Sequence, residues 1–531
     1  MKAIVTDAEI CTPADLFALL STVDDVGFIG ALSTVAAALE RTSDDGPLYN
    51  RLAAAILAEA FVASAGHAAL EGEADRTLER LFRCANGIPS RNPGELANAE
   101  LTEHNCRMVL RMGAQHEAYL GPLKPALARA EILFGRLLPA SLCGRSDPLT
   151  ALPTATGATY QEARALFLGT YGWVTAATVG SGPRFLTPHT LSTTSDGRRF
   201  WDVANAYAGD RAALSERRAT DPGYGFKDPQ DFRYSFSILR DVPFLRMGDG
   251  ALAVPVARHL GLALADGIYD FLSSHYASKN QGKEFDEIFG DVTDAYVRER
   301  FRRELGDGGY LPLRELGDGQ LSPDGLSGDD CVLELKGKRL LRGIITTGVL
   351  GAAPYFIGGK RGLGRGVAQL LSELDRTRRG QGRGLDRAKA DHAVLCLVTP
   401  DGLPGFHLGP VRNWVLRAFS TTIEKDFPEL RGELKALARF HWLSFDELDR
   451  ICRAARIAGC SVGRLLQRFR LETEGKPAFD TQTNRFQPSL RSWLLTRYPA
   501  SNDDPWFDEA FGEAWRDSTR RLLGVEIKLE V

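Results

Sequence analysis

Three ionisable residues near the middle of the chain have the types and spacing needed for metal-assisted hydrolysis of a phosphodiester. Asp324 is followed by Glu334, and one residue separates Glu334 from Lys336. Phosphodiester hydrolysis requires a nucleophilic water and positive charge beside the phosphoryl oxygens. Mg²⁺ supplies both, with carboxylate oxygens, waters and phosphate completing its octahedron. A nearby lysine orients or helps deprotonate the water and offsets phosphate charge.

The spacing of these residues predicts a hairpin that brings the carboxylates together. The run 331–335 is short, apolar apart from Glu334 and bounded by turn residues, as in a buried strand. Alternate side chains share a face in a strand, so Glu334 and Lys336 point the same way. Nine residues lie between Asp324 and Glu334. In an antiparallel hairpin, each pairing step takes one residue from each strand, so the residues between a directly opposed pair are used up two at a time. An odd number between them leaves an odd loop and places Asp324 directly opposite Glu334, with Cβ atoms about 5 Å apart. A register shifted by one residue would turn Asp324 to the other face.

Elements on either side of the hairpin complete an expected α/β module. Residues 283–305 carry apolar side chains at helical spacing, and Asp294 lies close to this stripe. Arg298, four residues further on, is a candidate ion-pair partner for Asp294, so a surface pair and a role in the site both stay open. Further strand, helix and strand candidates follow at 310–315, 366–376 and 392–399. The order predicts a central mixed sheet flanked by helices.

The pattern of Pro323-Asp324, nine residues, then Glu334-Leu335-Lys336 resembles the PD-(D/E)XK nuclease superfamily, which has the restriction-endonuclease-like fold. Residues 289–297 are similar to the helix that such families place before the core, with Asp294 where the pattern has Glu. Residues 366–370 resemble the helix after the core, whose Gln often lines the site. The resemblance covers about residues 283–400.

This resemblance implies roles for individual residues. Asp324, Glu334 and the Leu335 carbonyl would bind Mg²⁺, for which Mn²⁺ could substitute. Lys336 would be catalytic together with the two carboxylates. Asp294 and Gln369 would be auxiliary residues of the site.

Local charge agrees with a nucleic-acid substrate. The net charge of −3 gives no overall basic signature, so a nucleic-acid binder would carry its positive charge locally. Residues 336–342 contain four cations and no acid, and residues 360–389 contain nine cations and three acids, a local charge of +6. This predicts contacts with a phosphate backbone, although a solvated Gly- and Arg-rich loop is the alternative. The cations assigned to nucleic acid are Lys338, Arg339, Arg342, Lys360, Arg361 and Arg365.

The remaining sequence predicts a mixed, largely α-helical chain into which the α/β core is inserted. Its 531 residues suggest two to four domains. The expected parts are a helical domain, a mixed α/β linker or accessory domain, the nuclease-like domain and a C-terminal helical domain, at 1–145, 146–274, 275–410 and 411–531.

Composition excludes several other classes. Eight cysteines without a CxxC pair favour reduced thiols and a cytoplasmic location, and the scattered histidines argue against a zinc site. The most apolar helix candidate, 52–70, contains Glu59 and His67, so it predicts a buried helix and no membrane partner. The Gly-rich run 358–364 lacks the order of a nucleotide-binding loop.

The leading hypothesis is a Mg²⁺-dependent nuclease, with DNA a better expected substrate than RNA. The family implies a role in bacterial defence against phage, with the helical regions sensing a target, forming a homo-oligomer or binding a partner protein. A second hypothesis is an inactive protein that keeps the basic surface of a degenerate nuclease fold. A third is a DNA-binding regulator built on 445–470, which faintly resembles a helix-turn-helix, although an ordinary helical hairpin is favoured there.

Overall fold

The structure is a computed structural model. It describes residues 12–21, 23–41, 51–65, 77–87, 122–142, 144–176, 184–191, 196–220, 238–313, 321–337, 339, 362–403, 405–476, 479–480 and 485–524. The chain is mixed and largely α-helical, as expected.

The chain divides into two compact units. The described residues of the first lie in Asp286–Asp504, and those of the second lie in Ala3–Arg91, Ala114–Phe285 and Pro505–Val531. These units group residues differently from the expected four-part division, because residues on both sides of position 410 belong to the first unit.

The first unit is built on a five-stranded mixed sheet with the order β4-β5-β6-β7-β8. The strands are β4 (Leu311–Pro312), β5 (Gly325–Ser327), β6 (Cys331–Leu335), β7 (Val394–Thr399) and β8 (Phe440–Ser444). The pairs β4–β5 and β5–β6 are antiparallel, whereas β6–β7 and β7–β8 are parallel. Parallel neighbours need a crossover connection, and helices supply it here. Strand β6 is thus the point at which the sheet changes from antiparallel to parallel pairing.

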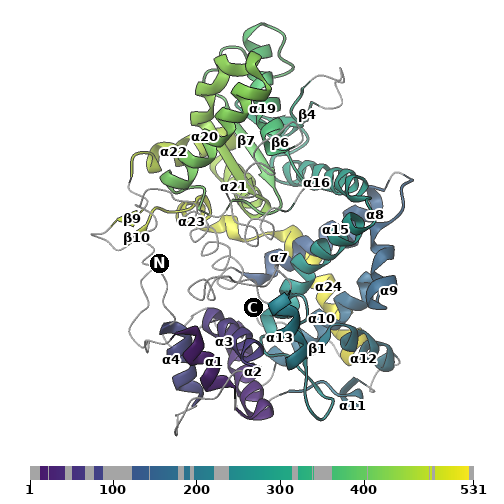
Figure 1. Ribbon diagram of the computed structural model, residues 1–531. Helices are drawn as coiled ribbons and strands as arrows, with labels where there is room; N and C mark the ends of the chain where they lie inside the picture. Colours follow the sequence, from purple (N-terminus) through teal and green to yellow (C-terminus); the bar gives the residue numbers. More distant parts are fainter. Residues whose placement is uncertain are drawn as a thin grey trace. The chain divides into compact units, whose positions relative to one another are not determined.

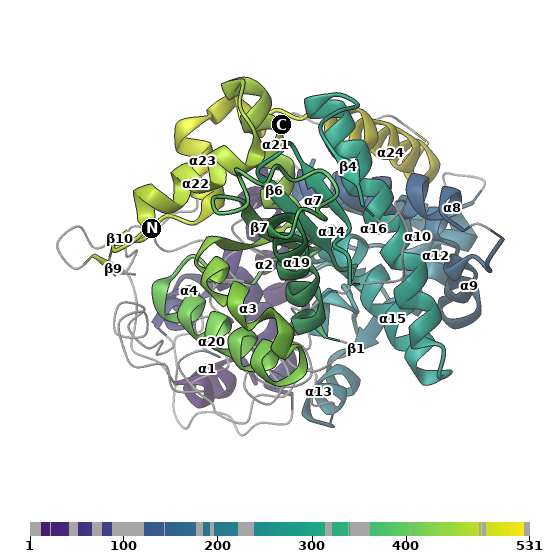
Figure 2. The same ribbon diagram turned by 90° about the horizontal axis from the view of Figure 1, so that it is seen from above.

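Helices cover both faces of this sheet (Figures 1 and 2). On the face that carries Glu334, α19 (Leu363–Arg378) packs on β6, and Phe419 of α20 (Gly409–Asp426) lies 5.5 Å from the Phe440 ring. On the opposite face, α21 (Phe445–Ala458) and α22 (Val462–Thr473) pack on the parallel strands. The strands are fully buried along β6 and β7, as expected for a sheet covered on both sides.

Strand β8 lies in the part of the chain, 411–531, for which the sequence predicts a helical domain. That prediction is wrong at Phe440–Ser444, which pairs in parallel with β7 from Leu395 to Thr399. Short apolar runs cannot be assigned to helix or strand by periodicity alone. Residues 440–444 form a strand because the edge of β7 offers backbone hydrogen-bonding groups that a neighbouring strand satisfies.

The other elements of the first unit are helical or short. The long helix α16 (Gly282–Leu305), whose part from Asp286 onward belongs to this unit, confirms the predicted helix at 283–305. The remaining members are the 3-10 segment η7 (Pro428–Arg439), the hairpin strands β9 (Phe479–Asp480) and β10 (Arg485–Phe486), α23 (Leu490–Arg497) and the 3-10 segment η8 (Pro499–Asn502).

The second unit is helical, with one three-stranded sheet of order β1-β2-β3. Its strands are β1 (Ala208–Asp210), β2 (Phe244–Arg246) and β3 (Leu252–Ala253). Its helices are α1 (Pro13–Leu20), α2 (Asp25–Arg41), α3 (Arg51–Ala63), α4 (Leu78–Gly87), α7 (Leu123–Ala130), α8 (Leu138–Ala140), α9 (Ala151–Thr156), α10 (Tyr160–Thr175), α11 (Pro188–Leu191), α12 (Gly197–Ala206), α13 (Arg211–Thr220), α14 (Ala257–Leu262), α15 (Ile268–Ser278) and α24 (Pro505–Leu523). Helical segments of other types lie at η1 (Glu131–Leu137), η2 (Pro148–Thr150), η4 (Ile238–Arg240) and η5 (Ala263–Gly267).

Local signals account for parts of this unit. At the start of α1, the Thr12 hydroxyl and the Asp15 carboxylate cap each other's backbone N–H groups. Helices α1 to α4 pack around one apolar core with Leu16, Phe61 and Phe82 among its fully buried members. In the described part of the chain, no single helix is long and apolar enough to span a membrane, although the bent pair α1 and α2 passes the same test of length and composition.

Candidate metal and nucleic-acid site

The register of β5 and β6 brings two carboxylates to one place. Gly325 lies opposite Leu333, and Ser327 lies opposite Cys331. Continuing this pairing by one residue places Asp324 opposite Glu334, as the odd spacing predicted. Asp324 is 3% exposed and Glu334 is fully buried. Burying two carboxylates is costly unless each has a partner, so their contacts indicate what the site can hold.

Each carboxylate uses one oxygen in a short contact. The backbone N–H of Leu335 donates to Asp324 Oδ2 at 2.7 Å, and Lys336 Nζ donates to Glu334 Oε1 at 2.5 Å. The N–H and C=O of one strand residue point to the same edge, so the Leu335 carbonyl also faces the Asp324 side. The Lys336 side chain is 29% exposed, which lets its ammonium reach a ligand from solvent. The site thus offers two carboxylates, a carbonyl and one ammonium.

Helix α19 packs directly against Glu334 and Lys336. A Cβ added to Gly366 would lie 3.1 Å from Glu334 Cγ and 3.1 Å from Lys336 Cε, so glycine permits this close approach. Gln369 Nε2 donates to the Ser322 carbonyl at 2.6 Å, which secures the segment that leads into Asp324. Gln369 therefore acts on the backbone before Asp324 in this structure.

Helix α16 contacts the chain directly after β6, at Gly337. A Cβ added to Gly337 would lie 2.8 Å from the Phe289 carbonyl and 2.9 Å from Thr293 Oγ1. Asp294 follows Thr293 directly, and its Oδ2 accepts a hydrogen bond from Arg298 Nε at 2.9 Å. The pair with Arg298 is thus present, on a helix that contacts the strand end beside Lys336.

Tyr310 is a member of this site that the sequence did not indicate. Its side chain is 8% exposed, and its hydroxyl has no hydrogen-bond partner among the described residues. Burial raises the pKa of the Tyr310 hydroxyl, and the charges of three carboxylates raise it further, those of Asp294, Asp324 and Glu334. All three carboxylates therefore lie within electrostatic range of one phenol. A lone tyrosine before a two-residue strand gave no signal in the sequence.

Gly325 is the residue that admits the Tyr310 ring. An added Cβ would lie 2.4 Å from Tyr310 Cζ and 2.5 Å from its hydroxyl. Gly325→Ala is expected to lower the free energy of unfolding by about 1–3 kcal/mol, because the stacked Tyr310 and Phe301 rings must shift. Urea unfolding of the full chain measures this. Gly290→Ala is the matched control, since nothing lies within 4 Å of a Cβ added at this position. Equal stability of the two variants would contradict the close contact between Gly325 and the Tyr310 ring.

Comparison of the chain with known protein families, with curated proteins and with solved structures found no match. The chemistry of the site therefore rests on the residues themselves. Among the described residues, no group of three or more His, Cys, Asp or Glu side chains is placed to hold a metal ion. Mg²⁺ is usually held by one or two carboxylates with waters and substrate phosphate, so the oxygens of Asp324, Glu334 and Leu335 fit it chemically.

The predicted nucleic-acid cations have different surroundings. Arg339 makes a two-atom contact with Asp401, with Nε 2.9 Å from Asp401 Oδ1, so an acid partly offsets its charge. Arg365 is exposed in the first turn of α19, next to Gly366. The other four, Lys338, Arg342, Lys360 and Arg361, lie outside the described residues.

A buried ionic network holds α16 against the C-terminal part of the first unit. Arg300 is fully buried, and its Nε lies 2.9 Å from Asp449 Oδ1 while its Nη2 lies 2.9 Å from Asp504 Oδ2. Burial alone would lower the pKa of Arg300, but the charges of Asp449 and Asp504 hold it well above its ordinary value. The Tyr296 hydroxyl donates to both oxygens of Asp449, at 2.7 and 2.8 Å.

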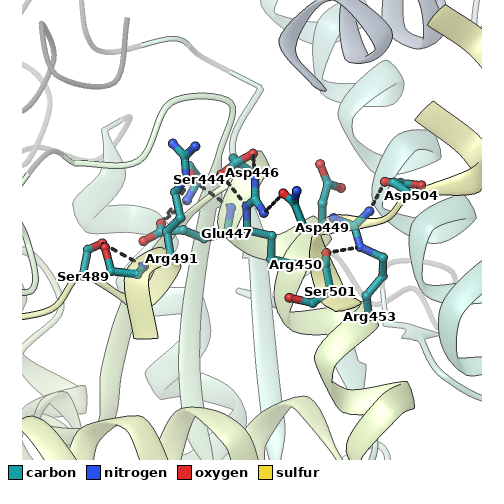
Figure 3. A network of polar contacts seen from close by, with 12 residues as sticks. Ser444, Asp446, Glu447, Asp449, Arg450, Arg453, Ser489, Arg491, Ser501 and Asp504 are labelled. Carbon is teal, nitrogen blue, oxygen red and sulfur yellow. Dashed lines mark hydrogen bonds and ion pairs between the residues drawn. The ribbon is translucent and has the colours of Figure 1, made fainter. Parts of the chain in front are cut away.

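Figure 3 shows the part of this network that lies on α21 and η8. Arg453 pairs with Asp504 and donates through Nε to the Ser501 carbonyl at 2.7 Å, and Arg450 pairs with Asp446 at 3.0 Å. Segments near positions 300, 450 and 504 are thereby held together by charge rather than by apolar contact alone.

Proposed function

We propose that this protein is a Mg²⁺-dependent nuclease whose site is formed by Asp324, Glu334 and Lys336. The observation that carries the proposal is the β5–β6 register, which sets the two carboxylates opposite each other with Lys336 on the face of Glu334. The order of helix, three strands, helix and strand in α16 to β7 supports a restriction-endonuclease-like core, as the sequence resemblance implied.

The chemistry of each residue follows from its position. Asp324, Glu334 and the Leu335 carbonyl would hold Mg²⁺, which supplies charge at the phosphoryl oxygens and an acidic bound water. Lys336 would orient the attacking water and offset phosphate charge, since its ammonium is held beside Glu334 and remains partly exposed. Asp294 would contribute negative charge from α16, and Gln369 would position the backbone before Asp324.

The substrate proposed is nucleic acid, with DNA preferred. Arg365 supplies an exposed guanidinium, and the first-turn N–H groups of α19 point positive charge toward the same region. A role in defence against phage is proposed from the family resemblance alone.

Incubation of the purified chain with plasmid, linear duplex, single-stranded DNA and RNA tests the proposal. Cleavage is expected with Mg²⁺ or Mn²⁺, and EDTA should abolish it. Lys336→Ala should lower the rate by at least about 10²-fold, because a group that assists the attacking water is lost. Lys425→Ala, at an exposed position of α20, is the matched control and should cleave as the native chain does.

Two outcomes would contradict the mechanism. Cleavage that survives both EDTA and Lys336→Ala would exclude a metal site at these residues. Absence of cleavage on every substrate would favour an inactive nucleic-acid-binding protein with a degenerate nuclease fold.

A further inference from the structure

A cluster of guanidinium groups lies at the start of β8. Arg412 comes from the first turns of α20, Arg439 from the residue before β8, and Arg470 from α22. Arg412 Nη2 donates to the Ala438 carbonyl at 2.7 Å and to the Phe440 carbonyl at 3.4 Å. Arg470 Nη1 donates to the same Ala438 carbonyl at 3.4 Å. Two guanidinium groups therefore converge on one exposed carbonyl oxygen.

Acids offset these charges only weakly. Among the described residues, the hydrogen bonds of Arg412 go to backbone carbonyls, with no carboxylate as acceptor. Arg470 has one ion pair, with the exposed Glu474 at 4.0 Å. Arg439 donates to the Ala393 carbonyl at 2.8 Å and to the Ala390 carbonyl at 3.4 Å. Among the described residues, these contacts involve at most two of the three nitrogen atoms of each guanidinium, which has five N–H donors.

The charges repel one another. Burial lowers the pKa of Arg412, and the charge of Arg470 lowers it further against the opposing effect of Glu474. Burial also lowers the pKa of Arg439, with Arg378 and Arg470 acting in the same direction and Asp391 and Glu433 opposing them. Such an arrangement costs free energy in the unliganded protein, and a bound anion would recover it.

A buried histidine lies within electrostatic range of two of these arginines. His441, the second residue of β8, is 7% exposed, and its Nε2 has no hydrogen-bond partner among the described residues. Burial lowers the pKa of His441 to about 3, with the charges of Arg412 and Arg470 adding to the effect. The imidazole is thus a neutral polar group within electrostatic range of Arg412 and Arg470, with its Nε2 buried and its ring 6.4 Å from the Phe469 ring.

We propose that Arg412 and Arg470, with Arg439 and His441 beside them, form a phosphate-binding site at the outer edge of β8. Guanidinium groups match phosphate because their parallel N–H donors fit its oxygens in pairs. The site takes a phosphate monoester or diester, either in a nucleic-acid backbone or on a free nucleotide.

This site is separate from the candidate nuclease site. Strands β6, β7 and β8 are parallel, and Glu334 lies level with Leu397 and Trp442. Ala438 precedes Trp442 by four residues, roughly 13 Å along the strand, and β8 is two strands away from β6. The inference therefore does not depend on the proposed nuclease activity.

Binding to the full chain in EDTA, which prevents cleavage, tests the proposal. Isothermal titration with inorganic phosphate and with adenosine monophosphate should give saturable binding in a chloride buffer of matched ionic strength. Arg412→Gln and Arg470→Gln should each weaken it by about tenfold or more, because each removes a charged hydrogen-bond donor. Arg464→Gln, at an exposed position on the same helix α22, should leave it within about twofold of the native value.

Thermal unfolding separates a ligand site from a structural cap. Without phosphate, Arg470→Gln should keep or raise the melting temperature, since it relieves repulsion. Added phosphate should raise the melting temperature of the native chain more than that of this variant. A lowered melting temperature with unchanged phosphate binding would assign the arginines to capping alone and overturn the proposal. Arg470→Gln keeps the test informative if Arg412→Gln fails to fold.

Anisotropy with a short labelled duplex, also in EDTA, identifies the source of the phosphate. A loss of duplex affinity in Arg470→Gln and not in Arg464→Gln would assign the site to a nucleic-acid backbone. Unchanged duplex affinity with weakened adenosine monophosphate binding would assign it to a free nucleotide. Equal binding of every ligand by the native chain and both variants would overturn the proposal.

Discussion

Glu334→Gln is expected to lower Mg²⁺-dependent cleavage by at least about 10³-fold, equivalent to about 4 kcal/mol of transition-state stabilisation. The substitution preserves shape and still offers Lys336 a carbonyl oxygen, but it removes the negative charge that would hold the metal. Glu334 is fully buried beside α19, so a change of charge without a change of volume isolates its electrostatic role.

The measurements are initial rates of plasmid cleavage and titration of the protein with Mn²⁺ followed by electron paramagnetic resonance. The variant should lose both cleavage and metal binding while its circular dichroism stays unchanged. Glu373→Gln is the matched control, because Glu373 is equally buried but bonds to Arg376 and to the Arg383 N–H. Retained cleavage in Glu334→Gln, or an equal loss in Glu373→Gln, would exclude Glu334 as a specific metal ligand.

Asp449→Ala is expected to lower the free energy of unfolding of the first unit by about 3–5 kcal/mol. The change leaves Arg300, which is fully buried, without one of its two aspartate partners, and it removes the acceptor of the Tyr296 hydroxyl. Breaking a buried ion pair from one side is strongly destabilising because the remaining charge stays desolvated. The loss should appear first where α16 meets α21.

Hydrogen exchange of α16 and α21 amides against denaturant measures this stability locally. Asp375→Ala serves as the control, since Asp375 pairs with the largely exposed Arg379 at 3.0 Å and surface pairs contribute at most about 1 kcal/mol. A loss below about 1 kcal/mol in Asp449→Ala would show that the network adds little to stability. Reduced cleavage at temperatures where the variant remains folded would further connect α16 and Asp294 to the nuclease site.

Local sequence patterns were sufficient to predict several helices and strands of the first unit. The apolar stripe of α16, the short apolar run of β6 and the odd gap between Asp324 and Glu334 depend on residues close together in the chain. Side chains repeat with one period in helices and another in strands, so the type of element can be inferred from the sequence without knowledge of the tertiary structure. The pairing of Asp324 with Glu334 follows from parity for the same reason.

The sequence by itself thus determined which carboxylates can meet, whereas the tertiary structure decided what surrounds them. Strand β8 forms because β7 offers an edge, and Tyr310 enters the site because Gly325 leaves room for its ring. Arg300 meets Asp449 and Asp504 across some 150 to 200 positions of sequence, a convergence that no periodic pattern records. The guanidinium cluster at β8 likewise joins residues from three elements. Contacts between distant segments depend on how layers pack, and that information is absent from any short stretch of sequence.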